Sequence, residues 1–292
     1  MLFVTTSCTQ KPVADSNPFF NEFDTPFGVP PFEMIMAKHY MPAFEKGMAE
    51  GRSDLEAILA NKKKPDFRNT IEAFDRSGEL LSMVSAVFFA QASAVTGDSI
   101  QKIEMEISPV LTRYRDEILL NPELFSRVKA VYDNQAEFNL NDEQKFLLEN
   151  LYKGFVRNGA NLSKQDQDTL KVLNEKLSVL TVKFSQNVLA ETNSFKMYVG
   201  RDDLAGLPES LIAAAAETAE ADGQAGKWAF TTQRPSIFPF LQYSENRELR
   251  RQIYSAYTNR GNNGNEFDNK KILAEIVKLR AERAKLLGYK TH

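Results

Sequence analysis

The two histidines are the side chains of this 292-residue sequence best suited to hold a metal ion, and their placement argues against that role. A helical zinc site needs two histidines four residues apart on one helix face, with a carboxylate nearby as general base. His39 and His292 stand far apart in the sequence, and neither has a second histidine at that spacing. His39, near a predicted helix start, is therefore interpreted as structural.

The sequence offers equally little for nucleophilic or phosphate chemistry. It contains no G-x-S-x-G elbow, no P-loop and no dinucleotide fingerprint. The single cysteine, Cys8, lies in a terminal segment without a paired histidine, which makes it a poor nucleophile. Gly261 and Gly264 follow no strand and have no lysine partner, so we do not expect them to bind phosphate.

Three arginines near the carboxyl end, Arg247, Arg250 and Arg280, are the charges with the most specific placement. Arg280 falls in step with the apolar seam of its predicted helix, so we expect it to be at least partly buried. A buried guanidinium needs a carboxylate or carbonyl partner. This favours a structural ion pair, with a substrate contact as the open alternative. The seam consists of Leu273, Val277, Ala284 and Leu287.

Two predicted helices carry these arginines, one from Ser244 to Gly261 and one from Asp268 to Gly288. Each has a polar start and a glycine stop, and turn formers fill the chain between them, so we predict a helical hairpin. Tyr254 and Tyr257, three residues apart, are interpreted as aromatics at the edge of the core rather than as proton donors.

Most of the remaining chain is also predicted to be helical. Apolar residues recur at helical spacing from His39 onward, and the strongest pattern runs from Gln165 to Asn193. Pro109 is expected to kink its helix. Asn121 before Pro122, and Asn141 with Gln144, have the spacing of helix caps.

Strand signals occur in only two places, at Phe195–Val199 and Lys227–Thr232. A helix from Pro208 to about Ala221 separates them, and we predict a small hairpin or a three-stranded insert packed on helices. Arg234–Pro239 is predicted to be a proline-punctuated loop. Asn17–Met36, rich in proline and phenylalanine, is predicted to be an extended arm held on the helices by its aromatic side chains.

Charge and composition limit the partners of this chain. A net charge of −3 gives no footprint for nucleic acid. No apolar run approaches the ~18 to 20 residues of a membrane helix. Met1–Cys8 combines a short apolar run, small residues and cysteine, and resembles the end of a bacterial lipoprotein signal. We therefore predict a signal remnant and tether over residues 1–16, with a possible lipid anchor at Cys8. We expect the protein on the periplasmic side of the cell envelope, with the cytoplasm as the alternative.

Several stretches, taken in order, resemble the thimet-oligopeptidase-like zinc metallopeptidases, and among them the bacterial peptidyl-dipeptidases. The resemblance extends from about Asn17 to His292, and it is specific because of the order of its pieces. These are Asn17-Pro18 with Pro30-Pro31-Phe32, His39-Tyr40-Met41-Pro42-Ala43-Phe44, Asn69-Thr70-Ile71-Glu72, Gln186-Asn187-Val188-Leu189-Ala190-Glu191-Thr192, Asp203–Pro208, Arg247–Arg250 with Tyr254–Tyr257, and Leu279–Tyr289.

That resemblance implies a mainly α fold: an elongated multi-helix array with a small β-hairpin insert, forming the amino-terminal half of a two-lobed zincin-type peptidase. Residues 17–243 would be a channel-wall domain and residues 244–292 the start of the catalytic domain. The resemblance also implies one zinc ion, short unfolded peptides as substrates, and release of carboxyl-terminal dipeptides. No H-E-x-x-H motif occurs here, so the zinc ligands would lie outside this chain. We assign it no catalytic, cofactor-binding or metal-ligating residue.

Three functional hypotheses remain. The first is the amino-terminal part of a zinc peptidase, inactive alone, that narrows a substrate channel. The second is a non-catalytic helical module that binds peptides, and the third is a helical scaffold unrelated to peptides.

Overall fold

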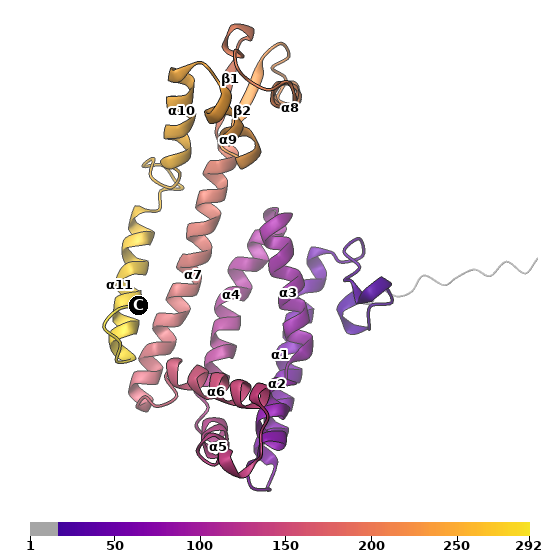
Figure 1. Cartoon of the computed structure of the whole chain (residues 1–292), viewed down its shortest axis with the longest axis vertical. Helices are drawn as coiled ribbons and strands as arrows, with labels where there is room; N and C mark the ends of the chain where they lie inside the picture. Colours follow the sequence, from indigo (N-terminus) through magenta and orange to yellow (C-terminus); the bar gives the residue numbers. More distant parts are fainter. Residues whose placement is uncertain (1–16) are drawn as a thin grey trace, which may run out of the picture. The chain divides into compact units, whose positions relative to one another are not determined.

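The computed structural model describes residues 17–292, which divide into two compact units at the bond between Val172 and Leu173. Helices dominate both units, and one antiparallel strand pair is the regular β structure of the described residues (Figure 1). The predicted mainly α fold with a small β insert is thereby confirmed. The functional boundary at residue 244 stays a prediction, because compactness does not test it.

Three long helices build the first core of the first unit: α1 (Ala37–Ala60), α3 (Glu79–Ala94) and α4 (Asp98–Leu119). Tyr40, Phe44 and Phe88 pack edge to face at its centre, with ring centroids 4.9 and 5.4 Å apart. Gly47 lets α1 approach α3 closely, since a Cβ there would stand 2.8 Å from backbone atoms of Leu81. Helix α4 continues through Pro109.

Shorter elements build the second core of this unit. They are a π-helical turn η3 (Phe67–Glu72), α2 (Ala73–Asp75), α5 (Pro122–Asp133), a 3-10 turn η4 (Gln135–Glu137) and α6 (Asp142–Arg157). Asn121 caps α5 by accepting from the Leu124 amide at 2.9 Å, and Asn141 forms a reciprocal capping box with Gln144. Both predicted caps are thus confirmed. The core beneath them includes Ile71, Leu124, Val128, Leu148 and Phe155.

The amino-terminal arm, residues 17–36, contains two short 3-10 turns, η1 (Pro18–Phe20) and η2 (Pro26–Gly28). Its Phe19 is buried against Tyr40, and Phe23 packs on the same cluster. Phe27 is fully exposed, at 103%. The predicted attachment by aromatic side chains therefore holds for part of the arm only.

The long helix α7 (Lys164–Ser194) contains the division between the units, and the second unit continues from it. Strands β1 (Lys196–Val199) and β2 (Trp228–Thr231) pair antiparallel, with Lys196 opposite Thr231. The 3-10 turn η5 (Arg201–Asp203) and α8 (Glu209–Ala221) lie between the strands in sequence. The core beneath the sheet includes Met197, Phe230, Ile237, Phe240 and Ile253.

Helix α9 (Arg234–Tyr243) corrects the predicted loop at Arg234–Pro239. Pro235 stands in the first turn of α9, where a missing N–H costs no hydrogen bond, so its presence does not oppose a helix. Burial of Ile237 and Phe240 outweighs the cost of Pro239 farther along. Helices α10 (Arg247–Thr258) and α11 (Lys270–Leu286) lie within the predicted ranges, but they follow one another rather than folding back side by side, so the predicted hairpin is wrong (Figure 1).

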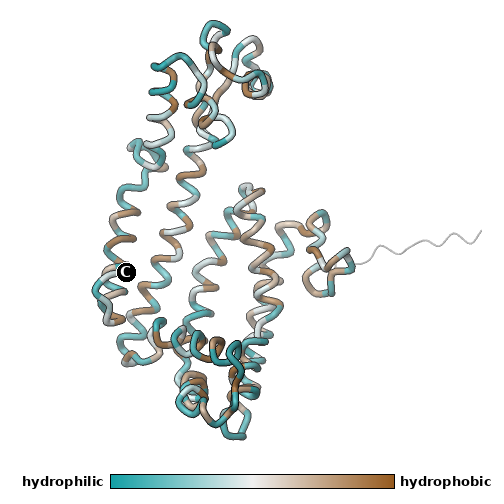
Figure 2. The backbone as a smooth tube through the Cα atoms, viewed as in Figure 1, coloured by the Kyte–Doolittle hydropathy of each residue, from teal (hydrophilic) through white to brown (hydrophobic). Residues whose placement is uncertain are grey.

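Hydrophobic and hydrophilic residues are interspersed along the helices rather than gathered into long blocks (Figure 2). Accordingly, none of the helices within residues 17–292 is long and apolar enough to span a bilayer.

Candidate functional site

A hydrogen-bonded polar site in the second unit is formed by the asparagine-rich turn, residues 261–269, which connects α10 to α11. A 2.7 Å hydrogen bond from the backbone N–H of Asn269 to the Gly261 carbonyl closes the turn. Gly261 and Gly264 both adopt positive φ angles, of 75° and 69°, which a residue with a Cβ rarely adopts. These two glycines therefore serve the shape of the turn.

Glu191, near the carboxyl end of α7, accepts the hydrogen bonds that hold the asparagine-rich turn against that helix. Its carboxylate is 4% exposed and accepts three hydrogen bonds from the turn. The donors are the backbone N–H of Gly261, the Asn263 amide at 3.0 Å and the Asn265 amide at 2.5 Å. All three donors are uncharged, so the negative charge is stabilised by dipoles alone.

The charge state of Glu191 follows from two opposed effects. Burial acts to raise the pKa of this carboxyl, but the hydrogen bonds from Asn263, Gly261 and Asn265 together outweigh it and hold the pKa below its usual value. A carboxylate in this state is ionised and saturated with donors at neutral pH. Its chemistry is that of a structural acceptor and not of a general acid.

A second contact fastens the end of the turn to the same helix. Asn187 donates its side-chain amide to Asn269 at 2.9 Å, and Asn269 donates in turn to the Phe184 carbonyl at 3.0 Å. Arg260 donates to the Thr192 hydroxyl at 2.9 Å, and its guanidinium lies 3.9 Å from the ring centroid of Tyr257. The stretch Gln186–Thr192, one piece of the family resemblance, is thus a part of α7 that binds the turn and the residue before it.

Sequence reasoning did not single out Glu191. Its partners lie 70 to 74 residues farther along the chain, where local periodicity carries no information. One signal was available, because Asn187 and Glu191 are polar residues four apart on one helix face, on either side of the apolar run Val188–Ala190.

The structure corrects the prediction for Arg280, which is exposed. The buried face of α11 is formed by Ile276, Leu279 and Ala284, whereas Leu273 and Val277 of the predicted seam are 51% and 58% exposed. Two faces of this helix carry apolar residues, and the spacing alone predicted burial of the face that is in fact exposed. The arginine that turns toward the body of the unit is Arg283, which donates to Asn174 at 2.9 Å.

The other predicted residues have mainly structural surroundings. Arg250 donates to the Ser244 carbonyl, while Arg247 is exposed. Tyr257 packs edge-on against Phe238, with 5.8 Å between ring centroids, and Tyr254 is 56% exposed. The structure does not bring Arg247, Arg250 and Arg280 together through any described contact.

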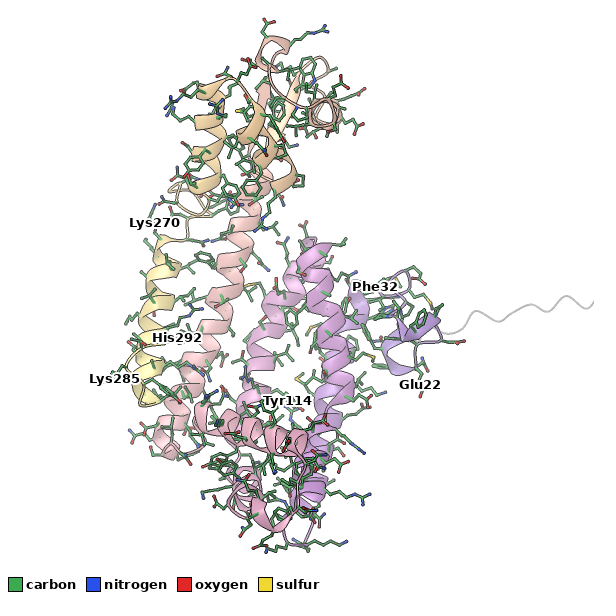
Figure 3. The ribbon with its side chains drawn as sticks, in the orientation of Figure 1. Glu22, Phe32, Tyr114, Lys270, Lys285 and His292 are labelled. Carbon is green, nitrogen blue, oxygen red and sulfur yellow. The ribbon has the colours of Figure 1, made fainter. Side chains whose placement is uncertain are left out.

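Neither histidine lies in a metal-binding arrangement. His39 is buried, and its Nδ1 accepts from the Met36 amide at 3.1 Å, so the ring proton is assigned to Nε2. That Nε2 has no hydrogen-bond partner within the described chain. His292 is exposed beside α11 (Figure 3). Between residues 17 and 292 no three His, Cys, Asp or Glu side chains are grouped to hold a metal, and Cys8 lies outside that range.

Comparison with known proteins indicates the class of protein that this chain resembles. Residues 240–292 match Peptidase family M3. The chain is 37% identical over 274 residues to dipeptidyl carboxypeptidase of Escherichia coli, a match that covers 94% of the chain and 40% of that relative. It is 33% identical to oligopeptidase A of Haemophilus influenzae and 29% identical to a probable cytosolic oligopeptidase A of Arabidopsis thaliana. Each of these two matches covers 95% of the chain and 40% of the relative.

These matches confirm the particular resemblance predicted from the sequence, to the amino-terminal portion of the bacterial peptidyl-dipeptidases within the thimet-oligopeptidase-like zinc metallopeptidases. The chain spans about 40% of the length of these relatives.

One prediction is overturned by the comparisons. The chain was expected to be a lipoprotein on the periplasmic side of the envelope, but its relatives dipeptidyl carboxypeptidase and oligopeptidase A are cytoplasmic enzymes. The expectation rested on the pattern of Met1–Cys8, which lies outside the residues that the structure describes.

Proposed function

We propose that this chain is the amino-terminal part of a zinc-dependent peptidase that cleaves short, unfolded peptides and releases dipeptides from their carboxyl ends. The observation that carries the proposal is the 37% identity to a dipeptidyl carboxypeptidase along 94% of the chain. Relatives named oligopeptidase A match nearly the same length at lower identity, which supports peptides as the substrate class.

The residues present do not fit a zinc site, because the described part of the chain groups no three potential ligands. The ligands of the single zinc ion and the general base are therefore assigned to a region outside this chain. The role proposed for residues 17–243 is to wall the substrate channel and to exclude folded proteins. Alone, the chain is expected to hydrolyse no peptide.

The asparagine-rich turn has a defined part in this proposal. The match to Peptidase family M3 begins at residue 240. It therefore includes α10, the turn and α11, whereas Glu191 precedes it. The hydrogen bond that the turn donates to Glu191, and the one that Asn269 accepts from Asn187, therefore tie the start of the proposed catalytic region to the long helix before it. We infer that this connection fixes the direction in which the catalytic region continues.

The proposal can be tested by continuing residues 1–292 with the carboxyl-terminal region of the Escherichia coli relative that lies beyond the match. The hybrid is expected to release dipeptides from the carboxyl end of a blocked nonapeptide, measured by mass spectrometry. Chelation should abolish release and added zinc should restore it. If the hybrid does not fold, the two parts are to be expressed as separate chains and mixed.

The control is the chain alone, which should leave the peptide intact. Hydrolysis that persists in chelator, or products of single residues only, would overturn the assignment. Binding of the nonapeptide without hydrolysis in the zinc-loaded hybrid would instead favour the non-catalytic peptide-binding module.

A further inference from the structure

Contacts at both ends hold one side of helix α11 against α7. Near the start of α11 the side-chain amide of Asn269 donates to the Phe184 carbonyl at 3.0 Å, and near its end Arg283 donates to Asn174 at 2.9 Å. The two helices therefore run side by side in opposite directions (Figure 1). Packing on α7 thus accounts for one side of α11 only.

A second apolar face of α11 is exposed. Leu273 and Val277 are 51% and 58% exposed, and Ala281, a further four residues along, is exposed as well. Residues four apart lie one above another on a helix, so these three side chains form a continuous row, here named the open face. A helix with apolar rows on two sides is typical of one that packs against a neighbour on each side.

Cations border the open face along both edges. At about 100° per residue, Arg280 lies along one edge, whereas Lys278 and Lys285 lie along the other, and all three are exposed. A second copy of α11 would bring like charges together, which disfavours self-association through this face. Two large apolar side chains also give too small an area for stable attachment to an anionic bilayer. The complementary partner is a helix with Asp or Glu beside its apolar row.

The chain turns back after α11. Gly288 has a φ of 82° and donates its N–H to the Lys285 carbonyl at 3.1 Å, and the Tyr289 N–H donates to the Ala284 carbonyl at 2.8 Å. This is a left-handed helix stop, which reverses the direction of the backbone. The carboxyl end, marked C in Figure 1, accordingly lies back alongside α11 rather than beyond its last turn.

We propose that the open face of α11 is covered by a helix that follows the last residue of this chain in the proposed full-length peptidase. This inference rests on the proposed function, which places the catalytic region beyond the chain. The Escherichia coli relative has the length to supply such a helix, since the match covers 40% of it. The covering helix runs antiparallel to α11 and completes a hairpin at Gly288. It sets apolar residues against Leu273 and Val277. Its carboxylates face Lys278 and Arg280.

Thiol labelling measures whether the open face is covered. Val277→Cys and the control Val172→Cys are each made in a Cys8→Ser background, both in the chain alone and in the hybrid with the Escherichia coli region. Both valines lie on helices, and they are 58% and 54% exposed. Labelling by N-ethylmaleimide, quantified by peptide mass, should be at least tenfold slower at position 277 in the hybrid than in the chain alone. At position 172 the two rates should agree within threefold. Equal rates at position 277 in the two proteins, or equal slowing at both positions, would overturn the proposal.

A shorter extension makes the test independent of the folding of the whole hybrid. The chain is continued with only the about 40 residues of the Escherichia coli relative that follow the match, which is enough for the turn and a helix. Position 277 should again be protected at least tenfold. If both extended chains leave it as reactive as in the chain alone, no covering helix binds there.

Charge reversal tests the chemistry of the covering helix. Lys278→Glu combined with Arg280→Glu in the hybrid should speed labelling at position 277 at least fivefold, because carboxylates would then face carboxylates. The matched control combines Lys176→Glu with Lys183→Glu, two exposed positions on α7, and should leave the rate within twofold. Unchanged labelling after the first pair of substitutions would contradict an acidic partner.

Two other occupants of the open face would also overturn the proposal. One is a dimer of the chain alone, seen by sedimentation equilibrium and abolished by Val277→Asp. The other is binding of the chain to phosphatidylglycerol vesicles, abolished by the same substitution. An inactive hybrid with position 277 protected would contradict the proposed function alone, whereas an active hybrid with position 277 unprotected would contradict this inference alone.

Discussion

Two non-helical segments, the amino-terminal arm and the asparagine-rich turn, are each attached to helices by a different kind of interaction. The arm is attached largely by apolar contacts, with Phe19 in an aromatic cluster, and by a 2.7 Å hydrogen bond from the Asn17 side-chain amide to the His39 carbonyl. The turn is attached by directional hydrogen bonds that converge on Glu191 and Asn269. Apolar attachment does not require every residue of the segment to be buried, and Phe27 of the arm is exposed. A buried carboxylate, by contrast, is destabilised when any of its hydrogen-bond donors is lost.

The largest expected effect follows from removing the acceptor of the turn. Glu191→Ala removes three hydrogen bonds to a charged acceptor, one buried and two part-buried, and at ~1.5 kcal/mol for each bond we expect a loss of about 4.5 kcal/mol in the free energy of unfolding. Urea denaturation followed by circular dichroism measures this loss. The control is Glu217→Ala, an exposed glutamate on α8, which should change stability by less than about 0.5 kcal/mol. Equal effects of the two substitutions would show that the turn does not depend on Glu191.

A smaller effect is expected from removing the apolar anchor of the arm. Phe19→Ala should cost roughly 3 kcal/mol, at the low end for a buried phenylalanine because a segment near the chain end can rearrange. The matched control is Phe27→Ala in the same arm, which should cost close to nothing because that ring is fully exposed. Limited proteolysis should cut the arm of the Phe19 variant faster. Similar cutting of both variants would contradict anchoring by Phe19.

The smallest expected effect is a pH dependence that belongs to the turn alone. The folded pKa of Glu191 lies below its usual value of 4.5, because three hydrogen bonds outweigh burial. Its contribution is therefore complete above the unfolded pKa and is lost as pH falls through the folded pKa. The nearby carboxyl of Asp268 stays ionised in this window, because hydrogen bonds from Lys270 and the Gly264 amide lower its pKa to about 2.

Urea denaturation of the parent chain and of Glu191→Gln between pH 7 and pH 3 measures this effect. The stability difference between them should be constant at the upper end and should narrow as pH falls below 4.5. The same titration of Phe19→Ala should show a difference independent of pH, because no ionisable group is removed. A constant difference for Glu191→Gln would mean that its carboxylate does not stabilise the turn.

Local sequence signals predicted the local features of the fold. Asn121 and Asn141 cap helices at the predicted positions, and both strands lie within the predicted ranges, because these features depend on residues only a few positions apart. The helix at Arg234–Tyr243 was missed because prolines were interpreted without regard to their position in a first turn.

The candidate site could be predicted far less well. Arg280 was placed on the wrong face because α11 carries apolar residues on two sides, so spacing alone does not select one. Glu191 depends on Gly261, Asn263 and Asn265, which only the folded backbone brings to α7. The resemblance marked the stretch Gln186–Thr192 without indicating what it contacts.

The geometry of the turn also sets the rate at which it ages chemically. Asn263 is followed by Gly264, a pair that loses ammonia when the glycine nitrogen attacks the asparagine side-chain carbonyl carbon, after which water opens the resulting cyclic imide to a carboxylate. In the docked turn the Asn263 amide is held by Glu191, and the Gly264 nitrogen donates to Asp268 at 2.7 Å. Deamidation would place a second carboxylate against Glu191. Its extent, measured by peptide mass in aged protein, should rise in Glu191→Ala and so report how often the turn leaves α7.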